Sequence, residues 1–342
     1  MTNMYKLIFL LTLFMGTMIS ISSYTWLGTW MGLEINLLSF IPLLKDKNNP
    51  YSSESSIKYF LVQAFASTIF MFSIMMIMMT SNLISDIINI NMFLMMMINS
   101  SLLLKMGAAP LHFWFPEIIE GMSWINSLIL MTWQKIAPMM LLSYTINFSN
   151  YIIFIILMST LVGSIGGLNQ TSLRKIMAYS SINHLGWMLS SFLYSEMLWI
   201  MYFTMYTFIS MTLIYMFNSF KIFYLKQMYT FMNKNLLIKF SLLLNLLSLG
   251  GLPPFLGFLP KWMVIQYLSN NYMWLLFFMI MMTLITLFFY LRISYTSLIL
   301  SHDELNFNIL MTMNTKMNLT MLFLSFISIS GLILCTILFN LY

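Results

Sequence analysis

Charged residues are scarce in this sequence of 342 residues. Asp, Glu, Lys and Arg together make up only 7%, whereas 60% of the residues are hydrophobic. A soluble globular protein carries about 25% charged residues, because its surface must face water. The composition therefore excludes a soluble enzyme, a disordered chain and a secreted disulfide scaffold. It leaves a polytopic membrane protein of the all-α class.

Cysteine is almost absent, since Cys335 is the single one. An internal disulfide, a thiolate metal site and an iron–sulfur cluster cannot be built from this chain alone. The three histidines, His112, His184 and His302, are scattered and show no ligand-pair spacing. Gly163 to Gly167 lacks the GxGxxG spacing of a dinucleotide site. We therefore expect no metal, no cofactor and no nucleic-acid partner for this chain.

Long apolar runs take the place of the missing charges. Crossing about 30 Å of hydrocarbon requires about 20 helical residues, and runs of that size predict about eleven transmembrane helices. Two of these runs are long and interrupted. The run at 7–19 is expected to be a retained span, because no cleavage signal follows it. The predicted spans are 5–22, 24–44, 57–80, 87–120, 122–147, 151–168, 175–194, 196–219, 236–269, 272–298 and 318–341.

Basic residues segregate to one side of this predicted topology. Twelve of the 15 Lys and Arg residues fall on the side of the N-terminus, and Asp86 and Glu196 fall on the other. Positive loops stay in the compartment where a membrane protein is made, so that side is the inner one. The twelve are Lys6, Lys45, Lys47, Lys58, Arg174, Lys175, Lys221, Lys226, Lys234, Lys239, Arg292 and Lys316.

The two interrupted runs share a motif. Glycine and proline recur at a constant offset of 144 residues, from Gly107 to Gly251, Pro110 to Pro254 and Pro116 to Pro260. Each motif falls in the fourth span of a set of five, and sets of five enter the membrane in opposite directions. The pattern predicts an inverted repeat of two five-helix units, 1–148 and 149–299, followed by a loop and final helix at 300–342.

Broken helices are the expected local structure of both motifs. Proline removes a backbone donor, and glycine allows the chain to leave helical dihedrals. Freed backbone groups are tolerated at membrane depth where they line a hydrated cavity, so the motifs point to a transport site. The residues expected to break the helices are Gly107, Pro110, Gly251, Pro253 and Pro254.

Four ionisable residues lie inside apolar segments: Glu34, Lys105, Lys135 and Lys261. Burying such a group unpaired costs a few kcal/mol or more, and intramembrane charges usually belong to ion pathways. A proton relay is therefore the functional interpretation, and a structural salt bridge is the alternative. Lys105 could also end an ordinary span and extend to the headgroups. His112 is either a relay member or a hydrogen-bonded loop residue.

Five segments resemble one known family. They are WLGTWMGLEINLLSFIP at 26–42, LKMGAAP at 104–110, WQKIAP at 133–138, SSINHLG at 180–186 and GGLPPFLGFLPKW at 250–262. Together they resemble the subunit 2 family of mitochondrial NADH:ubiquinone oxidoreductase (respiratory complex I), whose members are antiporter-like. The resemblance covers essentially the whole chain, and its compact, Met-rich form is similar to insect mitochondrial members.

The resemblance implies a proton-translocating membrane-arm subunit in the mitochondrial inner membrane. It implies a charged pair of Glu34 and Lys105, a central site at Lys135 and a far lysine at Lys261, a position where family members also carry glutamate. The N-terminus would face the matrix and the C-terminus the intermembrane space. Flavin, iron–sulfur clusters and ubiquinone would belong to other complex I subunits, which would be partners along with inner-membrane lipid such as cardiolipin.

Two other functions remain open on the residues alone. A free-standing cation/proton antiporter would use related broken helices and buried lysines. A scaffold whose buried charges only hold helices together would need no proton path. We expect Lys135→Met or Glu34→Gln to separate the relay from the scaffold, and the size of the native assembly to separate the subunit from the antiporter.

Overall fold

The structure is a computed structural model, and it describes residues 2–46, 49–81, 92–145, 149–232, 236–299 and 320–332. Over these residues the chain is helical, with a single isolated bridge pairing Ser172 and Tyr224. His302, Cys335 and Asp86 lie outside the described residues, as do Lys47, Lys234 and Lys316. The chain divides into two compact units, Met1–Ile155 and Ile156–Tyr342.

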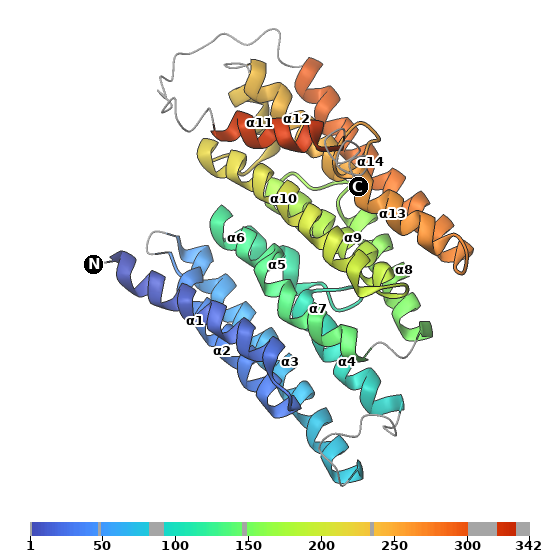
Figure 1. The fold of residues 1–342 in the computed structure, drawn as a ribbon. Helices are drawn as coiled ribbons and strands as arrows, with labels where there is room; N and C mark the ends of the chain where they lie inside the picture. Colours follow the sequence, from blue (N-terminus) through green and yellow to red (C-terminus); the bar gives the residue numbers. More distant parts are fainter. Residues whose placement is uncertain are drawn as a thin grey trace. The chain divides into compact units, whose positions relative to one another are not determined.

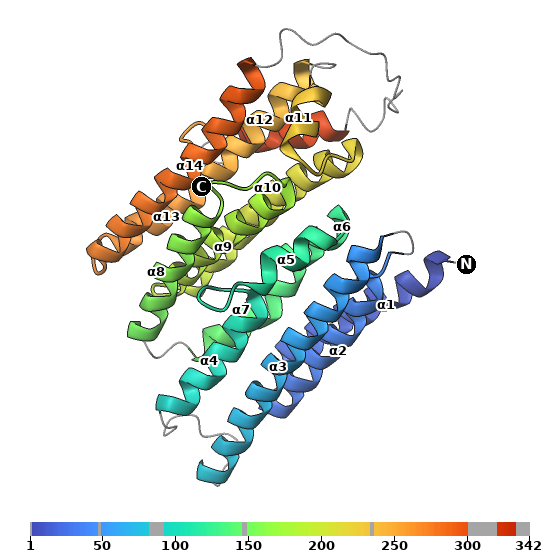
Figure 2. The same cartoon turned by 180° about the vertical axis from the view of Figure 1, so that it is seen from behind.

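The first unit is a bundle built around three long apolar helices. α1 and α2 pack along each other, α3 lies against α2 and α4, and α7 contacts α1, α4 and α6 (Figure 1). The view from behind shows α3 beside α4 as well (Figure 2). The helices are α1 (Thr2–Ser22), α2 (Trp26–Leu44), α3 (Pro50–Ser81), α4 (Met92–Met106), α5 (Trp114–Gly121), α6 (Trp124–Met131) and α7 (Trp133–Thr145).

The second unit packs α9, α12 and α13 against α10, and α14 against α9, α11, α12 and α13. A further helical segment at Thr320–Leu332 belongs to the same unit. The chain passes from the first unit to the second within α8. The remaining helices are α8 (Ser149–Gly166), α9 (Leu173–Phe192), α10 (Glu196–Phe220), α11 (Leu225–Met232), α12 (Leu236–Gly250), α13 (Phe258–Leu268) and α14 (Met273–Ile299).

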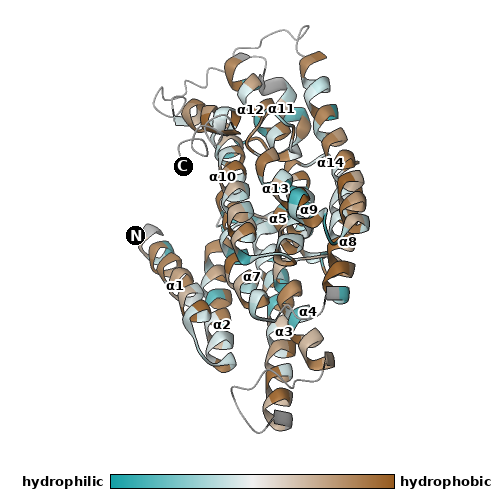
Figure 3. Ribbon diagram, turned by 45° about the vertical axis from the view of Figure 1, so that its right-hand side comes forward, coloured by the Kyte–Doolittle hydropathy of each residue, from teal (hydrophilic) through white to brown (hydrophobic). Residues whose placement is uncertain are grey.

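The helices suit a lipid environment. Apolar residues predominate along most of them (Figure 3), and within the described ranges five are long and apolar enough to cross a membrane. Their apolar outer faces stay exposed, as Phe65, Phe154 and Phe288 illustrate. Serine and threonine hydroxyls inside the helices mostly donate to carbonyls one turn earlier, for example Ser39 to Asn36 at 2.8 Å. Such local bonds satisfy polar groups that water cannot reach.

Two details differ from the expectations drawn from the sequence. The predicted span 122–147 is divided into α6 and α7, because Thr132 leaves the regular helix with φ −114° and ψ −71°. The stretch between α10 and α12, expected to be a loop, contains the short helix α11. The Gln227 side-chain oxygen accepts from the backbone N–H groups of Phe223 and Tyr224 at 2.8 and 3.2 Å, which caps the start of α11.

Candidate functional site

Lys105 lies at the end of α4, where the first broken helix stops. Gly107 follows with φ +75°, a conformation that glycine adopts without strain. Its N–H donates to the Leu104 carbonyl at 3.1 Å, and the Ala108 N–H donates to the Leu103 carbonyl at 3.1 Å. This pair of bonds is the Schellman termination of a helix. The break therefore holds the Lys105 backbone in a fixed position with its side chain 8% exposed.

A small cavity lies beside Lys105 and has both polar and apolar walls, the apolar ones including Leu33 and Leu37. Asn36 of α2, Gln63 of α3 and Gln134 of α7 line it together with Tyr59 and Lys105, and its volume is about 10 Å³. Gln134 donates to the Asn36 side-chain oxygen at 2.9 Å, and Gln63 donates to the Lys105 carbonyl at 3.2 Å. A volume of about 10–15 Å³ is the lower limit for one water molecule.

Pro138 also lines this cavity. It sits inside α7 and has no N–H to donate to the carbonyl of Gln134, four residues earlier. That carbonyl is therefore released from the helical ladder on the helix that carries Lys135. A released carbonyl beside a cavity with polar groups in its wall is a position where water can bind.

Glu34 stands on α2 and is half-buried. A carboxylate and an ammonium carry opposite charges and attract each other. Glu34 and Lys105 are both described, and no ion pair closer than 4.0 Å joins them. A charged pair of Glu34 and Lys105 would therefore act without a direct salt bridge.

Lys135 lies in the first turn of α7, just after the interruption at Thr132, and is 1% exposed. Its N–H donates to the Thr132 carbonyl at 3.2 Å. Its ammonium lies 5.6 Å from the centroid of the Phe115 ring, an arrangement that favours a cation. Phe115 also packs on Gly107, where an added Cβ would approach its Cβ to 3.0 Å. The first helix break therefore forms part of the wall around Lys135.

His112 lies between the two prolines of the first break and is 7% exposed. Its Nδ1 is 3.2 Å from the Pro110 carbonyl oxygen, and its own carbonyl accepts from the Phe115 N–H at 2.9 Å. Its ring centroid lies 4.3 Å from that of Phe113. These contacts all join His112 to neighbours in the chain, at the break or in the first turn of α5.

The second break ends its helix in the same way as the first. Gly251 has φ +83°, and its N–H donates to the Ser248 carbonyl at 3.0 Å while the Leu252 N–H donates to the Leu247 carbonyl at 3.4 Å. The offset of 144 residues relates Met106 to Gly250, where α4 and α12 end, and Trp114 to Phe258, where α5 and α13 begin. Both breaks thus use the same helix termination at matching positions.

Lys261 lies in the second unit, in the first turn of α13, and is 5% exposed. Its ammonium donates to the Gly250 carbonyl at 2.9 Å, so it joins the start of α13 to the end of α12 across the break. A cation at a helix C-terminus is favoured by the helix dipole. The ammonium also lies 5.9 Å from the centroid of the Trp187 ring.

A buried polar cluster on α9 and α10 lies in the same unit. His184 Nδ1 is 2.9 Å from the Tyr202 hydroxyl oxygen, and its ring centroid is 5.1 Å from that of Tyr206. Trp187, which faces Lys261, is one turn after His184 on α9. His184 thus makes a hydrogen bond between two helices, as its position inside an apolar helix leads one to expect.

The structure thus brings Glu34, Lys105 and Lys135 into the first unit and describes Lys261 with its own surroundings in the second. Sequence reasoning missed Asn36, Gln63 and Gln134, whose signal was a polar side chain within a predicted span. In the described ranges, no three His, Cys, Asp or Glu side chains gather in a way that could hold a metal ion.

Comparison with known proteins bears on this geometry. Residues 23–286 match the family model for the transmembrane part of NADH:quinone oxidoreductase and the Mrp antiporter. The NADH-ubiquinone oxidoreductase chain 2 of Anopheles gambiae is 54% identical over 334 residues, with 97% of each chain covered. That of Aedes aegypti is 55% identical over 335 residues, again with 97% of each chain covered.

A solved structure shows the same fold. A chain of respiratory complex I from Thermus thermophilus matches with a TM-score of 0.84 and 19% identity, covering 95% of this chain and 77% of that chain. The resemblance noted from the sequence is confirmed by the curated relatives. A multi-pass membrane protein of the antiporter-like fold follows from these matches. The chain therefore belongs to the NADH-ubiquinone oxidoreductase chain 2 family.

Proposed function

We propose that the chain is a proton-translocating, antiporter-like membrane-arm subunit of NADH:ubiquinone oxidoreductase. NADH oxidation and ubiquinone reduction then take place in other subunits of complex I, which carry the flavin and the iron–sulfur clusters. The observation that carries the proposal is a set of three lysines at most 8% exposed, each beside a helix break or interruption, in a chain of this family. Buried lysines in such places mark ion pathways.

Each ionisable residue has a separate role in the proposed relay. Glu34 and Lys105 form the charged pair, whose distance sets how strongly the ammonium of Lys105 is favoured. Lys135 is the central proton carrier of the first unit, and Lys261 is the carrier of the second. Desolvation disfavours a lysine ammonium and a nearby carboxylate favours it, so movement of Glu34 relative to Lys105 changes whether Lys105 holds its proton.

The cavity beside Lys105 supports a proton path from Lys105 toward Lys135. Its volume of about 10 Å³ suits a single water, and its walls supply the Lys105 side chain and the amides of Asn36, Gln63 and Gln134. A buried water usually makes about three hydrogen bonds to polar groups. Gln134, which lines the cavity, and Lys135, the proposed central carrier, are both residues of α7.

The finer topology is part of the same proposal. We place about eleven helices across the mitochondrial inner membrane, with repeats at 1–148 and 149–299 and a final helix within 300–342. The N-terminus faces the matrix and the C-terminus the intermembrane space, as the segregation of Lys and Arg indicates. The matched termination at Gly107 and Gly251 supports the repeat. Contacts with inner-membrane lipid, cardiolipin included, remain a prediction.

Neutralising Glu34 and Lys105 together tests the charged pair. We expect Glu34→Gln and Lys105→Gln each to lower proton pumping and coupled quinone reductase activity by several-fold in assembled complex. The double variant should lose less than the product of the single losses, because both changes remove one electrostatic coupling. Pumping in reconstituted vesicles and NADH:quinone activity are the measurements.

A matched control for this comparison of single and double variants is Glu54→Gln with Lys58→Gln. Glu54 and Lys58 form an exposed ion pair of 3.0 Å at the start of α3, where Lys58 also pairs with the exposed Glu117 at 3.1 Å. Exposed pairs of this kind contribute little. We expect pumping by this control to stay near the original value. Independent, multiplicative losses at Glu34 and Lys105 would contradict their coupling. A failure to assemble would favour the scaffold interpretation.

The size of the native assembly tests the subunit against a free-standing antiporter. We expect the full-length chain, extracted in mild detergent, to migrate in a native gel within a large complex that shows NADH dehydrogenase activity in the gel. The chain itself has a mass of 40.1 kDa. Migration of the native chain as a small, separate carrier would instead support the antiporter, the other class of protein that the family model covers.

A further inference from the structure

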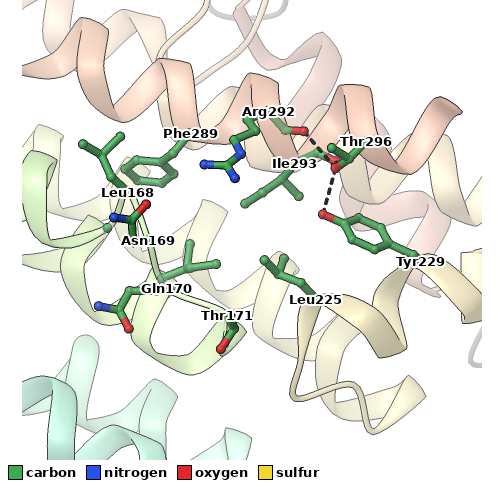
Figure 4. A pocket seen from close by; sticks show the side chains of 12 residues that line it. Leu168, Asn169, Gln170, Thr171, Leu225, Tyr229, Phe289, Arg292, Ile293 and Thr296 are labelled. Atoms are coloured by element: carbon green, nitrogen blue, oxygen red, sulfur yellow. Dashed lines mark hydrogen bonds between the residues drawn. The ribbon is translucent and has the colours of Figure 1, made fainter. Parts of the chain in front are cut away.

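We infer that a pocket at one end of the second unit binds the phosphate headgroup of an anionic phospholipid. The pocket has a volume of about 210 Å³ and lies between the loop that joins α8 to α9, the short helix α11 and the last turns of α14 (Figure 4). None of the residues in the proposed relay lines it. The inference is therefore separate from proton transfer.

Backbone hydrogen bonds hold two walls of the pocket together. The Leu173 N–H donates to the Phe223 carbonyl at 2.9 Å, and the Leu225 N–H donates to the Thr171 carbonyl at 3.1 Å. These bonds tie the α8–α9 loop to the start of α11. On the facing wall, Thr296 of α14 donates to the Tyr229 hydroxyl oxygen of α11 at 2.8 Å. The three elements are thus cross-linked around the pocket.

The polar side of the pocket suits a phosphate. The Arg292 guanidinium points into the space between the walls, opposite the side chains of Asn169 and Gln170 (Figure 4). No Asp or Glu is among the residues that line it. A guanidinium presents a planar set of donors that matches the oxygens of a phosphate, and amide and hydroxyl groups can add further bonds.

The other side of the pocket is apolar, which distinguishes a lipid from a free anion. Leu168, Leu225, Phe289 and Ile293 line it next to the polar groups. A free phosphate is hydrated on all sides and gains nothing from such a wall. The glycerol backbone and the first methylenes of a lipid would bury apolar surface against this wall, which lowers the free energy of binding.

The charge of this end favours an anionic lipid. Among the described residues of the second unit, Glu196 is the single acidic one. It lies at the start of α10, whereas Lys221 lies at the other end of that helix. Arg174 and Lys175 lie in the first turn of α9, and Lys226 lies on α11 beside the pocket. Basic clusters between membrane helices on the inner side attract anionic headgroups, at about 1 kcal/mol per Lys or Arg.

The length of α14 places the pocket at headgroup depth. Its 27 residues rise about 40 Å, whereas the hydrocarbon layer is about 30 Å thick. Arg292 is the twentieth residue of the helix, so the turn carrying Arg292 and Thr296 reaches the polar boundary of the membrane. This step rests on the proposed membrane topology. The cross-linking experiment below measures lipid binding at the pocket and does not depend on proton pumping.

A photoreactive lipid tests the inference on the assembled complex. The probe is a phosphatidylglycerol with a diazirine on the first carbons of one acyl chain, added in mixed micelles to detergent-purified complex. We expect peptides from 225–232 and 289–299 to be labelled. Unlabelled phosphatidylglycerol should compete, and phosphatidylcholine should compete weakly. Arg292→Gln should lower labelling about fivefold, the loss that corresponds to about 1 kcal/mol for one basic residue.

Two controls make the result decisive. Lys45→Gln removes an exposed lysine of the first unit and should leave labelling unchanged. Arg292→Lys keeps the charge without the planar donors and should retain intermediate labelling. Equal labelling by a phosphatidylcholine probe, or full competition by inorganic phosphate, would overturn an anionic-lipid site. So would a protein–protein cross-link showing that a neighbouring subunit fills the pocket.

Discussion

Replacing Lys135 with methionine is expected to abolish most proton pumping while the complex still assembles. Methionine fills a similar apolar volume, so the packing around Phe115 is retained, but it cannot carry a proton. Positioned proton carriers typically contribute 10²–10⁴-fold to a rate, and we expect a loss of at least about tenfold. Proton uptake by vesicles containing the variant complex, compared with its quinone reductase activity, is the measurement.

Lys135→Arg separates a relay from a structural charge at the same position. Arginine keeps the positive charge beside Phe115 but does not release its proton under working conditions. A relay therefore predicts loss of pumping in both variants, whereas a purely structural cation predicts recovery with arginine. Lys45→Met, which changes an exposed lysine after α2 in the same way, should pump normally. Normal pumping by assembled Lys135→Met would rule out the central role.

Changing Gly251 to alanine is expected to damage the second half of the protein strongly. Gly251 has φ +83°, and a Cβ added there would lie 2.9 Å from Lys261 Nζ. The left-handed conformation costs an alanine about 1–2 kcal/mol, a factor of roughly 5–30 in an equilibrium constant. The new methyl group also pushes Lys261 away from the Gly250 carbonyl. We expect lower thermal stability of the assembled complex and lower pumping per complex.

Gly250→Ala is the matched control, one residue away. Its added Cβ would meet the Tyr290 ring at 3.4 Å, an ordinary van der Waals distance, and Gly250 is the last residue of α12. Alanine is preferred to glycine in a helix by about 1 kcal/mol, so this variant should be at least as stable as the original. Equal behaviour of the two variants in thermal denaturation would show that neither the conformation nor Lys261 matters.

Much of the fold could be predicted from the sequence because the lipid environment imposes simple rules. An apolar run of about 20 residues has to be helical, since unpaired backbone groups are costly in hydrocarbon. Gly107 and Gly251 were predicted to break their helices because glycine tolerates non-helical dihedrals. Both follow the ends of α4 and α12, and both have a positive φ. The four charged residues inside apolar runs were recognisable by the same rule, as residues that composition alone does not explain.

Other features depend on contacts between helices and could not be predicted. Asn36 and Gln134 meet across α2 and α7, and they are 98 positions apart in the chain. No periodicity within one helix identifies such a pair. The interruption at Thr132 is similar, because threonine is common inside membrane helices. Its side chain bonds back to the Leu128 carbonyl at 2.7 Å, a local choice that the sequence does not announce.

The bond from Lys261 to the Gly250 carbonyl has a mechanical consequence. The donor belongs to α13 and the acceptor to α12, so this bond restrains the two helices relative to each other. A hydrogen bond from an ammonium is roughly twice as strong as one from a neutral amine. Protonation of Lys261 therefore strengthens the bond between the two helices, and deprotonation weakens it. The protonation state of one side chain thereby sets how rigidly the broken helix is held.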